Sequence, residues 1–298
     1  MPNVSVIIPT YQRADLISET IESVLAQTYT DYEIIVVNDG STDNTKEVLA
    51  EFGDWITVIH QENQGPSVAR NTGIMASQGR YIAFIDDDDL WLPYKLEKQV
   101  SCFESNPNIG LVYANIVFFK GNHVSADLWP RRSHPPSVLQ DWMLFELNFI
   151  PILSVMVRRE CLDEVGLFDQ TLKYCEDYDL WLRIIEKFPV HFLNKPVGFY
   201  RWTTNSLSKN KEQILLNEIR VKEKAFSRNL NLKKLPLKQL NQAFYSQYLN
   251  LAYFYIHHYQ SEKARLILKK YQQARGIDSI YEWLWQISFP ALNSSPHL

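Results

Sequence analysis

The feature that most restricts the fold is an alternation of short apolar runs with helix-like segments between Val4 and Ile85. Four apolar runs are predicted as buried strands: Val4–Ile8, Glu33–Val37, Ile56–His60 and Tyr81–Ile85. Helices are predicted between them: Ala14–Gln27, a helix capped by Ser41 or Thr42 that runs through Phe52, and Ser67–Ala76. Strands this apolar, connected by helices, indicate a parallel sheet that is covered on both faces.

Polar residues gather directly after three of these strands, in Pro9–Thr10–Tyr11, Asn38–Asp39–Gly40 and Asp86–Asp89. In a parallel sheet, ligands bind beyond the carboxyl ends of the strands. The three clusters are therefore predicted to lie at the ligand-binding edge of the sheet.

Four consecutive aspartates, Asp86–Asp89, follow the fourth predicted strand. Carboxylates this close repel one another and raise one another's pKa, a cost that a bound cation removes. Hard divalent ions favour carboxylate oxygens, and Mg²⁺ commonly binds through one or two carboxylates plus the phosphates of a substrate. The run predicts a metal and phosphate site, and the alternative is a solvated acidic loop that caps the next helix.

Three further groups have both a functional and a structural interpretation. Asp39 can accept a hydrogen bond from a nucleobase or a ribose hydroxyl, or belong to a turn and helix cap. Glu176–Asp179 opens a predicted helix through Lys187, where acidic residues either complement the helix dipole or supply a general base. Arg70 can stabilise phosphates or the aspartates, or be an ordinary surface arginine.

The middle of the chain is less regular, and the part after about Ser208 is helical only. Strands are predicted at Ile109–Phe119, Ser154–Arg158 and Val190–Tyr200, a helix at Leu92–Ser105, and a long polar loop at Lys120–Ser137. The later helices are predicted at Lys211–Ser227, Pro236–His258, Ser261–Arg275 and Ile280–Phe289. These patterns predict one domain at residues 1–208 and a helical C-terminal extension at residues 209–298.

The charge distribution differs between the two predicted regions. Residues 1–208 hold 16 basic and 28 acidic side chains, whereas residues 209–275 hold 14 basic and 4 acidic ones. The basic helices either present solvated faces or attract an anionic substrate or an anionic lipid surface. A net charge of −4 gives no global signal for a nucleic-acid partner.

Cysteine usage and the N-terminus bear on the compartment. Cys102, Cys161 and Cys175 form no C-x-x-C pair, which fits a reducing compartment and argues against a disulfide framework or a zinc site. We expect no signal peptide and no transmembrane helix, because no apolar stretch approaches about 18 residues. The expected location is the cytoplasm, with peripheral contact at the cytoplasmic membrane face if the basic helices bind lipid.

Several segments, taken in order, carry a family resemblance. They are Val4–Tyr11, Ser23–Tyr29, Glu33–Asp43, Ala69–Gly73, Tyr81–Asp89 and Glu176–Arg183. The chain resembles the family 2 glycosyltransferases of the nucleotide-diphospho-sugar transferase fold. The resemblance implies a GT-A type α/β fold, in which a mostly parallel sheet is flanked by helices, with an α-helical C-terminal extension outside the resemblance.

The resemblance also implies a binding site for a nucleotide-sugar donor. Its residues would come from the strand ends and the short helix after the third strand: Pro9, Thr10, Tyr11, Arg13, Asp39, Arg70, Asp86 and Asp87. Thr10 and Tyr11 would line the nucleoside pocket, and Asp39 would contact the base. UDP is the favoured nucleotide.

Metal binding and catalysis would depend on two acidic motifs. Asp86 and Asp88 match the outer carboxylates of the family's D-x-D motif and would hold Mg²⁺ or Mn²⁺ at the diphosphate. Four aspartates in a row leave the register one residue later open as an alternative. Asp177 would be the general base, with Glu176 the second candidate, in a single displacement that inverts the anomeric centre of the sugar.

The resemblance implies transfer of one sugar to a hydroxyl of a glycan or a lipid-linked glycan. The Q-x-x-R-W motif of processive members is incomplete, since Gly198 stands where glutamine is expected before Arg201–Trp202. Lys120–Ser137 and Trp142–Pro151 are expected to govern the choice of acceptor. Two other functions stay open: a non-catalytic nucleotide-sugar-binding scaffold, and a sugar nucleotidyltransferase, whose usual Gly-rich basic loop is absent after Pro9.

Overall fold

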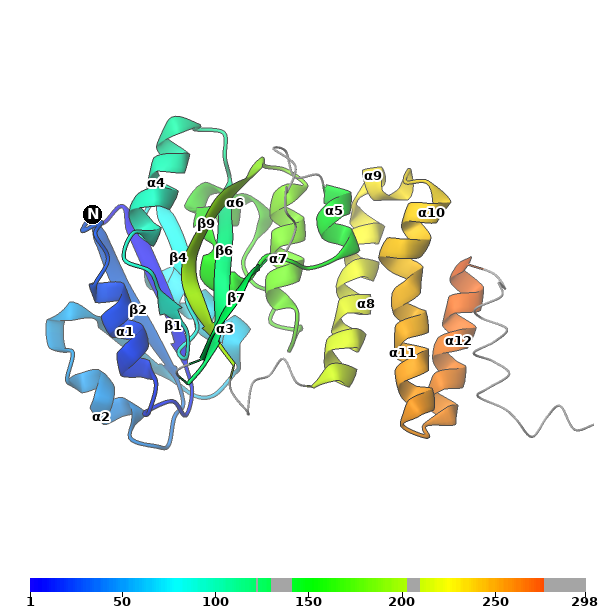
Figure 1. Cartoon of the computed structure of the whole chain (residues 1–298), viewed down its shortest axis with the longest axis horizontal. Coiled ribbons are helices and arrows are strands. Elements are labelled where there is room, and N and C mark those ends of the chain that lie inside the picture. The colour runs from blue at the N-terminus through cyan, green and yellow to red at the C-terminus, as the bar shows by residue number, and fades with distance from the viewer. Residues whose placement is uncertain (122, 130–140, 203–209, 276–298) are drawn as a thin grey trace, which may run out of the picture. The chain divides into compact units, whose positions relative to one another are not determined.

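The structure, a computed structural model, describes residues 1–121, 123–129, 141–202 and 210–275, and nine strands form one sheet across these ranges (Figure 1). Four parallel strands, adjacent in the order β3-β2-β1-β4, make up one half of it: β1 (Val4–Thr10), β2 (Tyr32–Asp39), β3 (Thr57–Gln61) and β4 (Tyr81–Phe84). Thr10 lies beside Asn38, and Asp39 beside Gln61. The polar clusters after β1 and β2 therefore meet at one edge, as predicted.

Helices cover both faces of the parallel strands, which is why β1 is buried along its whole length. The helix α1 (Ile17–Leu25) contributes to the same apolar cluster as Val6 and Ile8. On the opposite face lies α3 (Pro66–Ala76), where a Cβ on Gly73 would stand 2.6 Å from Ile7 Cγ2. Glycine is required there for the helix to approach the sheet this closely, and the predicted α/β arrangement is confirmed.

The other half of the sheet mixes strand directions. Beyond β4 come β8 (Met156–Arg158), β6 (Leu111–Lys120), β9 (Val190–Arg201) and β5 (Leu90–Trp91), and β7 (His123–Trp129) pairs with β6. β6 and β9 are parallel to each other, whereas β5, β7 and β8 pair in the antiparallel direction. This arrangement places the end of β9 beside β5, directly after the aspartates.

The predicted loop Lys120–Ser137 is wrong over residues 123–129, which form β7. Gly121 has a φ of 54°, a conformation that suits glycine in the turn between β6 and β7. The dipeptide Gly121–Asn122 is a hairpin signal in the sequence. The polar composition and the prolines of the segment nevertheless favour a loop, which is why the strand was not predicted. Residues 130–137 of the predicted loop lie outside the described residues.

The described residues fall into two compact units. The first unit is assigned to the ranges Met1–Leu144 and Asn148–Ser206. The second unit is assigned to Phe145–Leu147 and Leu207–Leu298. The predicted domain boundary after Ser208 stays a prediction, because residues 203–209 lie outside the described ranges. The remaining helices that follow β3 in the first part of the chain are α4 (Lys95–Ser105), α5 (Asp141–Glu146), α6 (Arg159–Val165) and α7 (Glu176–Ile185); α2 (Thr45–Ala50) follows β2.

The second unit is helical, as predicted. Its helices are α8 (Lys211–Arg228), α9 (Leu230–Lys233), α10 (Leu237–Leu240), α11 (Ser246–His257) and α12 (Ser261–Arg275). The helix predicted over Pro236–His258 is confirmed as an unbroken helical run from Leu237 to His257, but the prediction did not include the π-helical turn at Asn241–Tyr245 between α10 and α11. The buried ammonium of Lys222 donates to the carbonyl oxygen of Ala243 in this turn at 2.6 Å.

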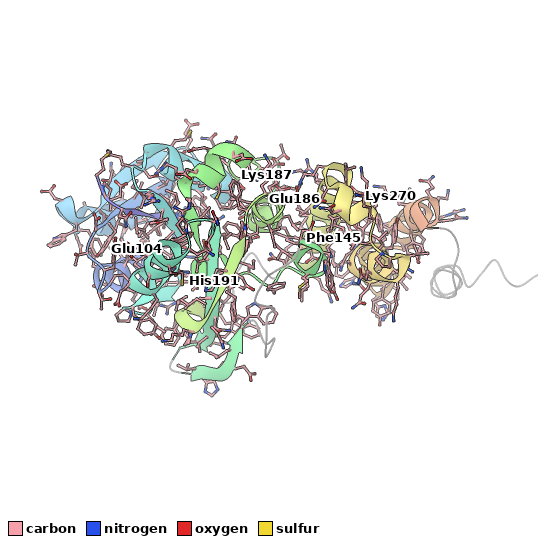
Figure 2. The ribbon with its side chains drawn as sticks, turned by 90° about the horizontal axis from the view of Figure 1, so that it is seen from above. Glu104, Phe145, Glu186, Lys187, His191 and Lys270 are labelled. Carbon is pink, nitrogen blue, oxygen red and sulfur yellow. The ribbon has the colours of Figure 1, made fainter. Side chains whose placement is uncertain are left out.

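Aromatic side chains fill the core of the second unit. Phe145, labelled in Figure 2, packs against Phe244 with ring centroids 5.9 Å apart, and Phe244 also contacts Phe226 at 5.4 Å. None of the helices in the described ranges combines the length and the apolar character that crossing a membrane requires. The helix predicted at Ile280–Phe289 lies outside the described residues.

Candidate active site

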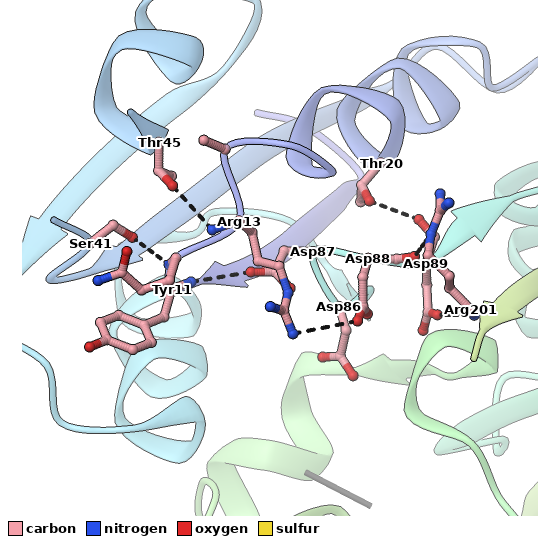
Figure 3. A network of polar contacts seen from close by, with 12 residues as sticks. Tyr11, Arg13, Thr20, Ser41, Thr45, Asp86, Asp87, Asp88, Asp89 and Arg201 are labelled. Atoms are coloured by element: carbon pink, nitrogen blue, oxygen red, sulfur yellow. Dashed lines mark hydrogen bonds and ion pairs between the residues drawn. The ribbon is translucent and has the colours of Figure 1, made fainter. Parts of the chain in front are cut away.

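The loop after β1 is held in place by side chains that follow β2 (Figure 3). Gln12 has a φ of 57°, and its backbone N–H donates to Ser41 Oγ at 3.0 Å. The backbone N–H of Arg13 donates to Thr45 Oγ1 at 3.2 Å. The expectation that Ser41 or Thr42 caps the second helix is wrong, because α2 begins at Thr45 with no side-chain cap and Ser41 instead supports the loop after β1.

The predicted nucleoside residues lie at the start of this loop. Pro9 and Thr10 are buried at the end of β1, whereas 46% of Tyr11 is exposed. The backbone N–H of Tyr11 donates to Asp87 Oδ2 at 3.1 Å. The loop after β1 is thereby joined to the aspartates, and the Tyr11 ring is left accessible.

Asp39 is buried and holds the loop that precedes α3. Its Oδ1 accepts from Gln61 Nε2 at 2.7 Å and from the backbone N–H of Gln64 at 3.0 Å, and its Oδ2 accepts from the backbone N–H of Gly65 at 2.8 Å. A carboxylate has about four acceptor positions, so these three hydrogen bonds leave room for one more donor. None of these three hydrogen bonds of Asp39 caps a helix or contacts Asp86–Asp89.

Arg70 connects the two acidic motifs. Its Nη2 donates to Asp86 Oδ1 at 2.7 Å and its Nη1 to Glu176 Oε1 at 2.6 Å. Arg70 is only 4% exposed; burial works against its charge, but Asp86 and Glu176 hold the pKa of Arg70 above its ordinary value. Of the roles considered for Arg70, the structure shows the contact with the aspartates and excludes an ordinary surface position.

Asp87 and Asp88 share one cation, Arg13. Arg13 Nε lies 3.5 Å from Asp87 Oδ1, and Arg13 Nη2 lies 3.8 Å from Asp88 Oδ2. Burial raises the pKa of Asp87 to about 7, with Asp88 and Asp86 adding to it. Burial and the charge of Asp86 raise the pKa of Asp88 to about 6. Even beside Arg13, burial and the neighbouring carboxylates therefore disfavour the charged forms of Asp87 and Asp88.

Asp89 differs from the other three aspartates because it is fully buried. Its Oδ1 accepts from the backbone N–H of Arg201 at 2.9 Å, and its Oδ2 has no hydrogen-bond partner among the described residues. Burial, with the charges of Asp86 and Asp88, raises the pKa of Asp89 well above its usual value. Burial inside the loop, away from solvent, therefore favours the neutral form of the Asp89 carboxyl group.

The second acidic motif begins α7. Cys175, with a φ of 59°, precedes the helix, and Glu176 is its first residue, paired with Arg70. Asp177 is half-buried, and its Oδ1 accepts the backbone N–H of Tyr178 at 2.6 Å. Burial, followed by the charge of Glu176, raises the pKa of Asp177 to about 7. A carboxylate with this pKa can both take up and release a proton near neutral pH.

Sequence reasoning missed the structural partners of the aspartates. Thr20 Oγ1 on α1 donates to the carbonyl oxygen of Asp89 at 2.8 Å. Arg201, at the end of β9, donates from Nε to the carbonyl oxygen of Asp88 at 2.7 Å. Only Arg201 was visible in the sequence, as part of an incomplete motif, and nothing local marks Thr20.

The aspartates fit a divalent cation in one specific respect. Within the described ranges, no cluster of three or more His, Cys, Asp and Glu side chains is arranged to hold a metal ion. Mg²⁺, however, commonly uses one or two carboxylates and completes its coordination with substrate phosphates and water. The side chains of Asp86 and Asp88 are 32% and 17% exposed, and the neighbouring carboxylates raise the pKa of Asp88, which suits that mode.

Comparison with known proteins gives the family. The sequence profile described as Glycosyl transferase family 2 matches residues 5–166, more than half of the chain. The putative teichuronic acid biosynthesis glycosyltransferase TuaG of Bacillus subtilis is 33% identical over 215 residues, which cover 70% of this chain and 83% of TuaG. WfgD of Escherichia coli, a UDP-Glc:alpha-D-GlcNAc-diphosphoundecaprenol beta-1,3-glucosyltransferase, is 35% identical over 214 residues, which cover 70% of this chain and 80% of WfgD.

Other relatives are longer than the matched part. Uncharacterised glycosyltransferases of Rickettsia felis and Rickettsia conorii are 36% and 38% identical, but the match covers 64% and 63% of this chain and only 33% and 32% of those proteins. The match to the uncharacterised glycosyltransferases of Rickettsia typhi and Rickettsia prowazekii covers 61% of the length of those proteins. The chain thus spans less than two thirds of the length of these relatives.

Solved structures confirm the fold. TarS of S. aureus in complex with UDP-GlcNAc superposes with a TM-score of 0.61 at 17% identity, covering 96% of this chain and 91% of that one. The mannosyltransferase PcManGT from Pyrobaculum calidifontis, in complex with GDP-Man and Mn²⁺, gives 0.63 at 20% identity, covering 98% and 81%. The fold is the GT-A type, and the chain belongs to glycosyl transferase family 2.

Proposed function

We propose that the protein is an inverting glycosyltransferase that moves one sugar from a UDP-sugar to a hydroxyl of a glycan or a lipid-linked glycan. The observation that carries the proposal is the continuous chain of contacts from Asp86 through Arg70 to Glu176, with Asp177 next in sequence. This chain of contacts supports Asp177, a half-buried carboxylate of raised pKa, as the base near the loop that would hold the donor's diphosphate. The UDP-sugar named for WfgD and the UDP-GlcNAc bound by TarS support the choice of UDP.

In this proposal the donor is held by the loops at the sheet edge. The exposed ring of Tyr11 stacks on the base beside Thr10 and Pro9, and Asp39 offers its remaining acceptor position to a base N–H. Arg13 lies between Asp87 and Asp88 and can turn one of its N–H groups to a phosphate oxygen. Arg13 would then offset part of the repulsion between the diphosphate and the aspartates.

The metal would be Mg²⁺ or Mn²⁺, held by Asp88 with Asp86. When bound, it neutralises the charge that develops on the diphosphate leaving group. The register Asp86/Asp88 is favoured over Asp87/Asp89 because Asp89 is fully buried, whereas the side chains of Asp86 and Asp88 are 32% and 17% exposed. PcManGT, which was solved with Mn²⁺, supports the use of a divalent ion.

Transfer requires a base and a stable leaving group. Asp177 accepts the proton of the acceptor hydroxyl while the oxygen of that hydroxyl forms a bond to C1 of the sugar. At the same time the bond from C1 to the diphosphate breaks, and UDP leaves. Glu176 is the weaker candidate for the base, since its carboxylate is paired with Arg70 at 2.6 Å. Arg70 keeps Asp86 and Glu176 in place during the step.

The first test is calorimetric binding of UDP, GDP, CDP and dTDP, each with Mn²⁺ and with EDTA. We expect UDP to bind with Mn²⁺ and to lose most of its affinity in EDTA, because the diphosphate then meets an acidic loop. Binding of a different nucleotide would replace UDP in the proposal. Binding of UDP without any transfer to acceptors would favour the scaffold, and binding of no nucleotide would reject the donor site.

The proposal includes contact of the basic C-terminal helices with an anionic membrane surface. No acidic residue occurs from Lys224 to Ser261. Two leucines in this stretch are exposed: Leu230 on α9 is 67% exposed and Leu237 on α10 is 54% exposed. Lysines near anionic lipid contribute about 1 kcal/mol each. We expect co-sedimentation with anionic vesicles at low salt and little with neutral ones. Equal behaviour with both vesicle types would contradict membrane contact of this kind.

A further inference from the structure

The side chain of Arg201 reaches the aspartates from the far end of the sheet (Figure 3). Its Nε donates to the carbonyl oxygen of Asp88 at 2.7 Å, and its backbone N–H donates to Asp89 Oδ1 at 2.9 Å. Its Nη2 donates to Glu19 Oε2 on α1 at 2.6 Å. One residue of β9 therefore connects the loop after β4 to the first helix of the fold.

The guanidinium group is enclosed by these contacts. Arg201 Cζ lies 4.5 Å from the centroid of the Phe119 ring on β6, the residue paired with Arg201 in the sheet. The side chain is 14% exposed. Among the described residues, the group contacts Phe119 with one face, Asp88 through Nε and Glu19 through Nη2, and it meets the candidate donor site through the loop.

The loop itself has few internal contacts that define its shape. The backbone N–H of Asp89 donates to the carbonyl oxygen of Asp86 at 3.2 Å, and Thr20 Oγ1 donates to the carbonyl oxygen of Asp89. Arg201 supplies a charged donor to the carbonyl oxygen of Asp88. A hydrogen bond to this carbonyl oxygen restrains the plane of the Asp88–Asp89 peptide and with it the ψ angle of Asp88, which narrows the directions open to the Asp88 side chain.

We propose that Arg201 is a positioning residue, which sets the backbone of the Asp86–Asp89 loop and through it the direction of the Asp88 carboxylate, without touching substrate. The inference rests on the proposed function for its effect on donor binding, but its effect on the loop is independent of any ligand. Lysine cannot replace Arg201, because a single ammonium cannot make the planar, two-sided contact with Asp88 and Glu19.

The test compares Arg201→Lys with Arg159→Lys as a matched control. Arg159 makes the same kind of contacts away from the aspartates: its Nε donates to the carbonyl oxygen of Gly79 and its Nη2 to Ser77 Oγ, both at 2.7 Å. We expect amide hydrogen exchange to accelerate at residues 86–91 in Arg201→Lys. In Arg159→Lys it should accelerate near residues 77–79 instead.

Binding and kinetics complete the test. Residues that orient ligating side chains typically change affinity by about 10- to 100-fold, so we expect Arg201→Lys to weaken UDP binding with Mn²⁺ and to lower kcat/KM by about tenfold or more. Glu19→Gln should act in the same direction and less strongly, and the Tm of Arg201→Lys should match that of Arg159→Lys.

Unchanged exchange at residues 86–91, or UDP affinity equal to that of Arg159→Lys, would overturn the positioning role. If the wild-type protein bound no nucleotide, the proposed function would fail. In that case the exchange comparison alone would still support or overturn the role of Arg201 in holding the loop.

Discussion

Asp177→Asn is expected to lose sugar transfer by about 10²- to 10⁴-fold, the usual contribution of a general base, with UDP affinity close to that of the wild type. The amide keeps the size of the side chain and can still accept the backbone N–H of Tyr178 through its oxygen. It cannot take up a proton. Steady-state transfer rates and calorimetric titration of UDP with Mn²⁺ measure the two quantities separately.

The pH dependence of the wild-type enzyme provides a second check on the same residue. Burial and Glu176 raise the pKa of Asp177 to about 7. Because a base acts only when deprotonated, kcat should fall with decreasing pH below about 7, by up to about tenfold per unit, and level off above it. The measurement is made at saturating donor, since Asp87 and Asp88 titrate in the same range and affect binding. The residual activity of Asp177→Asn should lack this dependence.

Glu176→Gln distinguishes the two candidate bases. Glutamine removes the negative partner of Arg70, so we expect weaker donor binding through Asp86 and a smaller loss in kcat than in Asp177→Asn. An active Asp177→Asn enzyme together with an inactive Glu176→Gln enzyme would transfer the role of base to Glu176. If both variants kept full activity, the base would have to come from outside this motif.

The parallel half of the sheet was predictable because each of its strands carries its own signal. An apolar run such as Val4–Ile8 can lie only in a covered strand, and the polar residues that follow it mark the strand end. The sequence also marked Arg70 and the two acidic motifs as candidates. Their arrangement into one chain of contacts depended on α3 and α7 approaching the same edge, which no local pattern shows.

Other features depended on partners far away in the sequence. Four adjacent aspartates are locally equivalent, and they differ only through distant contacts such as the backbone of Tyr11 with Asp87 and that of Arg201 with Asp89. For the same reason the π-helical turn was missed: the carbonyl of Ala243 that Lys222 contacts lies 21 residues away in sequence. Predicting these features requires the tertiary structure.

Asp88→Asn and Asp89→Asn are expected to have opposite effects, although the residues are adjacent. Asp88→Asn removes a charged oxygen from the proposed metal site, whose ion contributes several kcal/mol to transfer, so the rate should fall by about 100-fold or more. Its side chain is partly exposed, and its Tm should stay near that of the wild type. UDP affinity should become similar with Mn²⁺ and with EDTA.

Asp89→Asn should retain most of the transfer activity, because an amide resembles the neutral acid that the buried position already favours. Its oxygen can still accept the backbone N–H of Arg201. Its amide group, however, places two donors where Asp89 Oδ2 has no partner in the described part of the chain, and an unsatisfied buried group costs about 1–3 kcal/mol. Thermal unfolding should therefore show a lower Tm for Asp89→Asn and little change for Asp88→Asn.

The paired measurement decides the register of the proposed metal site. If Asp89→Asn abolished metal-dependent UDP binding while Asp88→Asn preserved it, the ligands would be Asp87 and Asp89, and the buried position of Asp89 would have to open when donor binds. Asp87→Asn distinguishes the two registers further. Its carboxamide oxygen can still accept the backbone N–H of Tyr11, so the substitution removes only the negative charge of residue 87. In the register we propose, Asp87→Asn weakens donor binding less than Asp88→Asn, since Asp87 is held by the loop after β1 and Asp88 faces the diphosphate.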